Sequence, residues 1–146
     1  KGHDGFLGNS VIGEWCNLGA DTNSSNLKNN YSNIRVWSYS AEGTIDTNLQ
    51  FHGLIMGDHS KCGINTMFNT GTIVGVGANL FGGNFLPKFI PSFSWGGSEI
   101  TETYQFDKAM SVASVVMQRR NLTLTDADKN ILSQVFTDSK KYRSWE

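Results

Sequence analysis

The chain has 146 residues and a formal net charge of −1, with 12 Lys and Arg against 13 Asp and Glu. Because the charges balance, there is no strong positive field, and we expect neither nucleic acid nor a membrane as a partner. No uninterrupted apolar run of about 18 residues predicts a membrane span, and the opening residues KGHDGFLG lack the apolar core of a signal peptide. Cys16 and Cys62 stand alone in apolar contexts, which predicts buried thiols in a cytoplasmic protein, and no metal-ligand spacing is present.

Residues 1–97 contain all 16 glycines and carry a six-residue period in two runs, 6–23 and 56–85. Each unit begins with an apolar residue, which is predicted to point inward, and has a small or short residue at its fifth place. The apolar residues are Phe6, Ile12, Leu18, Met56, Cys62, Phe68, Val74 and Leu80. Such a unit forms one short strand and a corner, and stacked coils bury a continuous core. The sequence therefore predicts a mainly β fold, a parallel β-helix of hexapeptide repeats over 1–97. Scattered glycine-rich loops would not keep this register.

The interruption at 24–55 separates the two runs. Its strand-like stretches IRVWSY and LQFHGLI enclose the polar segment AEGTIDTN, which predicts a hairpin-like excursion from the coils. Long excursions on rigid scaffolds often carry function.

The remaining residues, 98–146, have ordinary charge and no glycine, and they predict a helical C-terminal extension. One helix is expected over 106–120 and a second over 125–136, where Thr125 followed by Asp128 resembles a capping box. Their apolar stripes predict packing on the β-helix or on a neighbouring subunit.

The stretch GHDGFLGNSVIGEWCNLGADTNSSNL (2–27) resembles, without a gap, the acetyltransferase region of the family of bifunctional glucosamine-1-phosphate N-acetyltransferases and sugar-1-phosphate nucleotidyltransferases. The family pattern is G-H-x-x-Y-L-G, then I-G-x-x-x-N-[IF]-G-A-G-T. GLIMGDHSKCGINTMFNTGTIVGVGANLFGG (53–83) looks like the coils that follow in archaeal-type members. This resemblance implies a left-handed parallel β-helix that forms a homotrimer. It also implies acetyl transfer from acetyl-CoA to the amine of glucosamine-1-phosphate at the subunit boundary.

The resemblance also implies that the chain, which begins inside a patterned segment, is part of a larger enzyme. We expect further coils and a nucleotidyltransferase domain before Lys1, and Mg²⁺ is expected only for that domain.

Individual positions match the family's site residues. His3 matches the catalytic general base, and a histidine suits this role because its ordinary pKa lies near working pH. Phe6 and Asn17 match substrate-contacting residues, and Arg35 stands where archaeal-type members place a phosphate-binding lysine. The positions that match acetyl-CoA contacts are Ala20, Asn26, Leu27, Ile64 and Gly82. Lys88, in FLPKFIP, is a further candidate for the phosphates of coenzyme A.

Several positions depart from the family pattern. Phe6 lacks the hydroxyl of the expected tyrosine, Ser32 occupies a lysine position, and Asp21 replaces a glycine. Two alternatives therefore stay open. The β-helix could be a non-catalytic trimerisation scaffold for a nucleotidyltransferase, or it could acetylate another amino sugar. On pattern alone, a corner asparagine is the better explanation of Asn17 and of Asn26.

Overall fold

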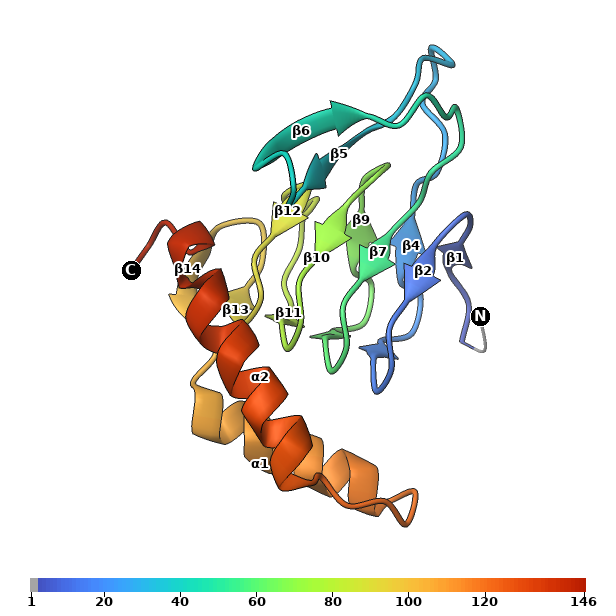
Figure 1. The fold of residues 1–146 in the computed structure, drawn as a ribbon. Helices are drawn as coiled ribbons and strands as arrows, with labels where there is room; N and C mark the ends of the chain where they lie inside the picture. Colours follow the sequence, from blue (N-terminus) through green and yellow to red (C-terminus); the bar gives the residue numbers. More distant parts are fainter. Residues whose placement is uncertain (1–2) are drawn as a thin grey trace.

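A computed structural model describes residues 3–146 as three sheets of very short parallel strands, followed by two helices (Figure 1). Sheet A contains β1 (Phe6–Leu7), β4 (Asn23–Ser24) and β9 (Met67–Phe68). Sheet B contains β2 (Val11–Ile12), β7 (Ile55–Met56), β10 (Ile73–Val74) and β12 (Phe89–Ile90). Sheet C contains β3 (Asn17–Leu18), β8 (Lys61–Cys62), β11 (Asn79–Leu80), β13 (Ser94–Gly96) and the antiparallel β14 (Ile100–Thr103).

The chain passes from sheet A to sheet B to sheet C and then begins the next coil above. Each strand of the middle coils buries its second residue, so Met56 and Val74 stack in register in sheet B. Cys62 and Leu80 do the same in sheet C. One strand and one corner per hexad therefore build a continuous apolar core. The prediction of a mainly β fold of parallel strands with two helices is confirmed.

The first coil departs from the expected register at Phe6. Leu7, rather than Phe6, pairs with Ser24 of β4 and takes the inward position, while Phe6 is 51% exposed on the outer face. The step from Leu7 to Ile12 is therefore five residues rather than six. The assignment of Phe6 as the first inward residue was wrong because two adjacent apolar residues, Phe6 and Leu7, fit the pattern equally well.

The corners between sheets are tight, and successive coils touch there through their backbones. A Cβ on Gly19 would collide with the backbone of Gly63 in the next coil, so only glycine fits this position. Asp21 and Asn65 adopt positive φ at the same corner, where short polar side chains are well tolerated. The corner residues therefore fix the distance between coils.

The excursion leaves the coils after β4 and returns at β7. It forms an antiparallel hairpin of β5 (Arg35–Ser38) and β6 (Gly43–Asp46), which lies along the upper side of the coils in Figure 1. Ile34 and Val36 are buried against Ile73 of β10. The hairpin thus covers part of the outer face of sheet B.

The helices α1 (Phe106–Gln118) and α2 (Asp126–Asp138) pack on the corner between sheets B and C, and η1 (Ser139–Tyr142) follows them. Their buried residues Met117 and Leu132 contact a cluster that includes Trp15 of that corner. Thr125 and Asp128 form the predicted capping box. Helix α1 ends two residues earlier than predicted and α2 ends two residues later. Among residues 3–146, no helix is long and apolar enough to cross a membrane.

Candidate functional site at the open face of sheet A

The outer face of sheet A stays open, whereas the hairpin and the helices cover other parts of the coils. Phe6 of β1 and Phe85, which bridges to Met67 of β9, are 51% and 57% exposed. An open apolar face on a rigid scaffold is a natural place for a ligand or a second subunit.

Four of the predicted residues form a column at the corner between sheets C and A. The backbone N–H of Asp21 donates to His3 O at 2.8 Å, and one coil further on Asn65 N donates to Ala20 O at 2.9 Å. Since β8 and β11 pair in register, Ile64 and Gly82 occupy the equivalent corner positions of the next two coils. All four residues are exposed, and Ile64 is 69% exposed. The column His3, Ala20, Ile64 and Gly82 therefore borders the open face.

Phe6 and Asn26 meet over the backbone of the first coil. The Phe6 ring and the Asn26 amide both lie over Gly8, where a Cβ would collide with each of them. The Asn26 amide also donates from Nδ2 to Asn9 Oδ1 at 2.7 Å. Leu27, the next residue, pairs with Phe51 at the root of the excursion. These residues lie toward the other edge of sheet A, at its corner with sheet B.

Arg35 and Lys88 also come together, and Lys28 lies close to Lys88. Lys88 Nζ donates to Arg35 O at 3.2 Å, and Lys28 Nζ donates to Asn33 O at 2.7 Å. Arg35 donates to Thr44 O at 3.3 Å. Burial lowers the pKa of Lys88, and the charges of Lys28 and Arg35 lower it further. Within residues 3–146, none of these three cations forms an ion pair with a carboxylate. A cluster of cations that forms no ion pair suits an anionic group such as phosphate.

Asn17 is set apart from these groups. It lies on the outer face of sheet C, in register with Lys61 of β8, whereas Phe6 lies on sheet A. Within one chain the structure therefore brings together most of the predicted residues around sheet A and leaves Asn17 on a neighbouring face.

The chemistry available at the face comes from a few groups. His3 has an exposed imidazole, a side chain that can serve as a general base. The amide of Asn26 and the backbone groups at the corners can donate or accept hydrogen bonds. In the described part of the chain, no group of three or more His, Cys, Asp or Glu side chains is placed to hold a metal ion.

Comparison with protein families finds no match. Among curated proteins, the chain is similar to the bifunctional protein GlmU of Methanococcus aeolicus, with 33% identity over 102 residues, which is 67% of this chain and 24% of that protein. It is also similar to the bifunctional protein GlmU of Methanocaldococcus jannaschii, with 35% identity over 73 residues, which is 50% of this chain and 17% of that protein. The chain is therefore similar to one part of each of these two proteins. It spans a quarter or less of the length of these two relatives.

The sequence does not single out one member of the cation cluster, Lys28. Lys28 directly follows the predicted residue Leu27, yet its pattern does not distinguish it from other surface lysines. Its association with Lys88 depends on how the excursion folds back on the fourth coil, across 60 residues of sequence. Only the folded structure reveals this association.

Proposed function

We propose that this chain transfers the acetyl group of acetyl-CoA to the amine of glucosamine-1-phosphate, as part of a bifunctional sugar-1-phosphate nucleotidyltransferase. The reaction takes place at the outer face of sheet A. His3 acts there as the general base, accepting the proton that the amine loses as its nitrogen attacks the thioester carbon. The thiolate of coenzyme A leaves and takes up a proton.

The column of His3, Ala20, Ile64 and Gly82 is the observation that carries this proposal. Sequence matching assigns these residues to the base and to acetyl-CoA contacts, and they come from four separate segments of the chain. Their alignment at one exposed corner supports a single elongated ligand that runs along the coils next to the base. Acetyl-CoA has this extended shape.

The cations Lys28, Arg35 and Lys88 provide the charge that the reactants require. Both glucosamine-1-phosphate and coenzyme A carry phosphate, and a cluster of cations without carboxylate partners favours such groups electrostatically. We assign Arg35 to the sugar phosphate and Lys88 to the phosphates of the coenzyme, with Lys28 supporting both.

The proposal includes a homotrimer of left-handed β-helices in a cytoplasmic enzyme, with residues 1–97 as the β-helix and 98–146 as a helical extension. A neighbouring subunit would cover the open apolar face of sheet A and complete the site. The exposure of Phe6, Ile64 and Phe85 supports such an arrangement. It would also give Asn17 a role, because a residue on sheet C of one subunit can face sheet A of the next.

Phe6 favours a second candidate function, a non-catalytic trimerisation scaffold. The family pattern has a tyrosine at this position. The half-exposed ring of Phe6 has no hydrogen-bonding atom at its tip. A scaffold needs the apolar surface but not the hydroxyl. The missing hydroxyl equally favours an acetyltransferase that acts on another amino sugar. Such an enzyme would differ from the proposed one only in its acceptor.

The experiment is an assay of acetyl-CoA-dependent acetylation of glucosamine-1-phosphate by the protein and two histidine variants. His3→Ala is expected to lower kcat by about 100-fold or more, the usual contribution of a general base. His59→Gln changes a histidine at the corner between sheets B and C and is expected to keep the wild-type rate. A rate that is equal in wild type and His3→Ala would remove His3 from the mechanism, and no acetylation in any form would favour the scaffold.

A further inference from the structure

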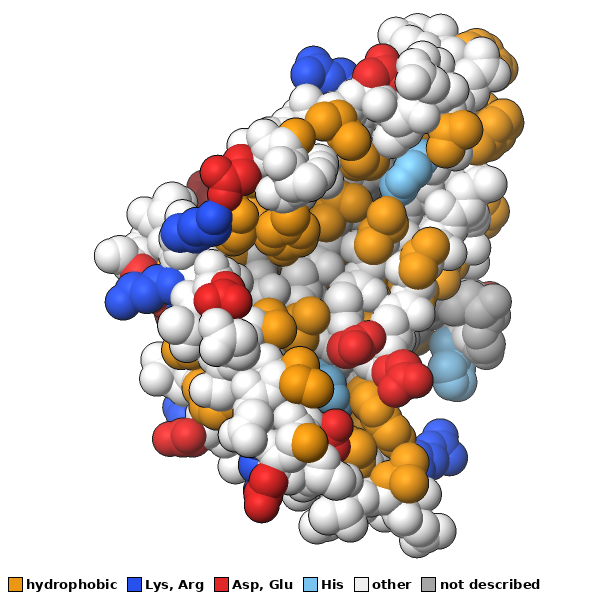
Figure 2. All heavy atoms as spheres, viewed as in Figure 1, with side chains coloured by type: hydrophobic (Ala, Val, Ile, Leu, Met, Phe, Trp, Pro, Cys, Tyr) orange, Lys and Arg blue, Asp and Glu red, His pale blue; other side chains and the backbone are white. Residues whose placement is uncertain are grey.

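A second concave surface lies over sheet B, on a different side of the coils from the open face of sheet A. It is enclosed by the outer face of sheet B, the β5–β6 hairpin and the end of α2 with η1, and its volume is about 940 Å³. Figure 2 shows hydrophobic side chains gathered around this hollow. The volume falls in the range of roughly 300–1,000 Å³ that is typical of pockets for small molecules.

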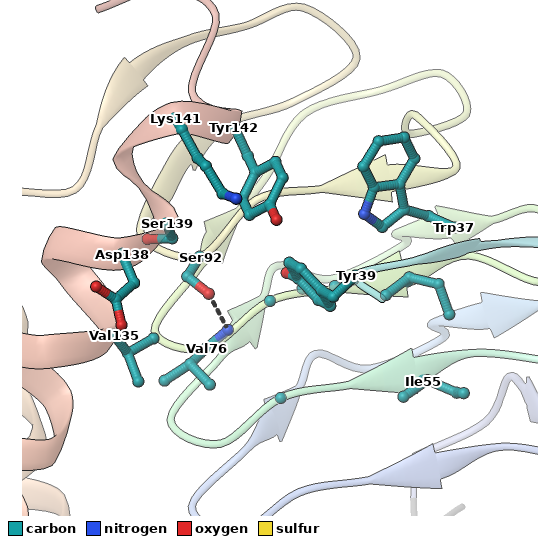
Figure 3. A pocket seen from close by; sticks show the side chains of 14 residues that line it. Trp37, Tyr39, Ile55, Val76, Ser92, Val135, Asp138, Ser139, Lys141 and Tyr142 are labelled. Carbon is teal, nitrogen blue, oxygen red and sulfur yellow. Dashed lines mark hydrogen bonds between the residues drawn. The ribbon is translucent and has the colours of Figure 1, made fainter. Parts of the chain in front are cut away.

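The lining of this groove is mostly apolar and aromatic. Its floor includes Ile55 and Ile73, which are outward residues of β7 and β10. One wall is built from aromatic rings: Trp37 stacks on Phe89 with centroids 4.4 Å apart, and Tyr142 meets Tyr39 edge-on at 5.3 Å. Figure 3 shows Trp37, Tyr39 and Tyr142 around the same hollow. Such a surface fits a flat or branched apolar body.

Polar contacts fasten the walls to each other. Lys141 and the Tyr142 hydroxyl both donate to Glu42 Oε1 at the tip of the hairpin, and the Lys141 interaction lowers the pKa of Glu42. On the other wall, Ser92 Oγ accepts from Val76 N at 2.9 Å, the dashed line in Figure 3. The hairpin and the C-terminal segment are therefore held together across the groove, which makes the cavity preformed.

The charges at the mouth of the groove do not cancel. Two of its lining residues are charged, Lys141 and Asp138. Lys141 is neutralised by Glu42. Asp138 accepts a hydrogen bond from the neutral amide of Gln134 at 2.8 Å, and in the part of the chain that the structure describes it has no cationic partner. The groove therefore combines an apolar interior with one uncompensated negative charge at its edge, where Figure 3 places Asp138 beside Val135.

We propose that this groove binds a small amine with an aromatic or branched apolar body. The body lies against Ile55, Ile73 and the aromatic wall, and the ammonium group lies at the mouth near the Asp138 carboxylate. An aromatic wall tolerates a cation well, because ring faces attract positive charge. A ligand of the same shape with a carboxylate in place of the ammonium group would be repelled by Asp138. A ligand with a neutral hydroxyl there would bind more weakly, because it makes no charge interaction with Asp138. This site is separate from the proposed acetyl-transfer face on sheet A.

Titration of ¹⁵N-labelled protein with 2-phenylethylamine, followed by NMR, tests the site. The Trp37 indole N–H is buried and has no hydrogen-bond partner among the described residues, so its resonance is a sensitive local probe, which Trp37→Phe identifies. We expect saturable shifts of this resonance, and binding about threefold to fivefold tighter for the amine than for 2-phenylethanol, the gain of an exposed charge pair. Equal affinities, or no shift of the Trp37 resonance, would overturn the proposal.

Three variants locate the binding. Val135→Trp fills the groove and is expected to abolish the shifts. Asp138→Asn is expected to remove the preference for the amine, whereas Asp107→Asn, an exposed acid on α1, is expected to keep it. Amine binding that survives in Val135→Trp contradicts the site. A wild-type oligomer that dissociates in Val135→Trp, measured by sedimentation, would show instead that a second copy of the chain fills the groove.

Discussion

Phe6 shows how one residue decides the register of a coil. Phe6 and Leu7 are both apolar, and the hexad pattern accepts either as the inward residue. In the structure Leu7 faces the core above Ser24, and Phe6 is left on the outer face beside Asn26. The sequence could identify the repeat but not this one-residue shift, since the deciding factor is the pairing of β1 with β4.

The outward position of Phe6 leads to a prediction about the reaction. Phe6→Tyr places a hydroxyl on the proposed site face, and we expect kcat/KM for acetylation of glucosamine-1-phosphate to rise about threefold to tenfold, the value of one hydrogen bond. The free energy of unfolding should change by less than about 0.5 kcal/mol because the ring is 51% exposed. Unchanged or lower kcat/KM at unchanged stability would separate Phe6 from substrate binding.

His59 is the residue whose surroundings predict a pH dependence of stability. Burial lowers the pKa of its imidazole below the ordinary 6.5, and Lys61 adds to this effect, while Asp58, Asp128 and Glu14 oppose it. The folded chain thus keeps His59 neutral at a pH where the unfolded chain already binds a proton. The stability that His59 contributes is complete above its unfolded pKa and is lost as the pH falls below that value toward the folded pKa.

We therefore expect His59→Gln to lose less stability than wild type between about pH 7.5 and about pH 5.5, as measured by urea unfolding. Other acidic groups destabilise both proteins on acidification, so the comparison is between the two slopes. Parallel losses in the two proteins would exclude His59 as a source of the dependence.

At the scale of elements, the coils and the helices were the easiest to predict. Six-residue spacing and the capping pair Thr125 and Asp128 depend on neighbours within a few residues, so local sequence contains the information. The contact of the hairpin with the C-terminal segment is different. Glu42 and Tyr142 are 100 residues apart, and no local pattern marks them as partners.

Arg143 fastens the C-terminal segment and has no sequence signal of its own. It is 3% exposed, and its guanidinium donates to Ser139 Oγ at 2.9 Å, to Phe136 O at 3.2 Å and to Glu146 Oε1 at 2.7 Å. A further contact reaches Ser92 O at 3.4 Å, which ties the segment to the fourth coil. A buried cation with this many acceptors is costly to remove, because each acceptor loses its partner.

Arg143→Met is accordingly expected to lower the free energy of unfolding by about 2–3 kcal/mol, measured by chemical denaturation. Arg119→Met, at an exposed position after α1, serves as the matched control and should change stability by less than about 0.5 kcal/mol. Equal effects of the two substitutions would show that the buried network does not hold the segment.

At the scale of the whole molecule, the three corners of the coil have different surroundings. The helices pack at the corner between sheets B and C, and the excursion and the cation cluster lie at the corner between sheets A and B. The third corner is exposed and carries His3, Ala20, Ile64 and Gly82. Matching of residues to a family pattern could nominate these four, but only the stacking of coils could place them in one column.

Stabilisation by acetyl-CoA tests the central claim, that this column is a coenzyme site. Because a ligand that binds only the folded state must stabilise it, the Tm of wild type should rise by several degrees at an acetyl-CoA concentration about 100 times the Kd. Ile64→Glu, which places negative charge in the column, should abolish the rise. Val11→Glu makes the same change on sheet B at a residue of similar exposure, 64% against 69%, and should keep it. A Tm that does not respond to acetyl-CoA in wild type, or that rises equally in Ile64→Glu, would contradict the claim.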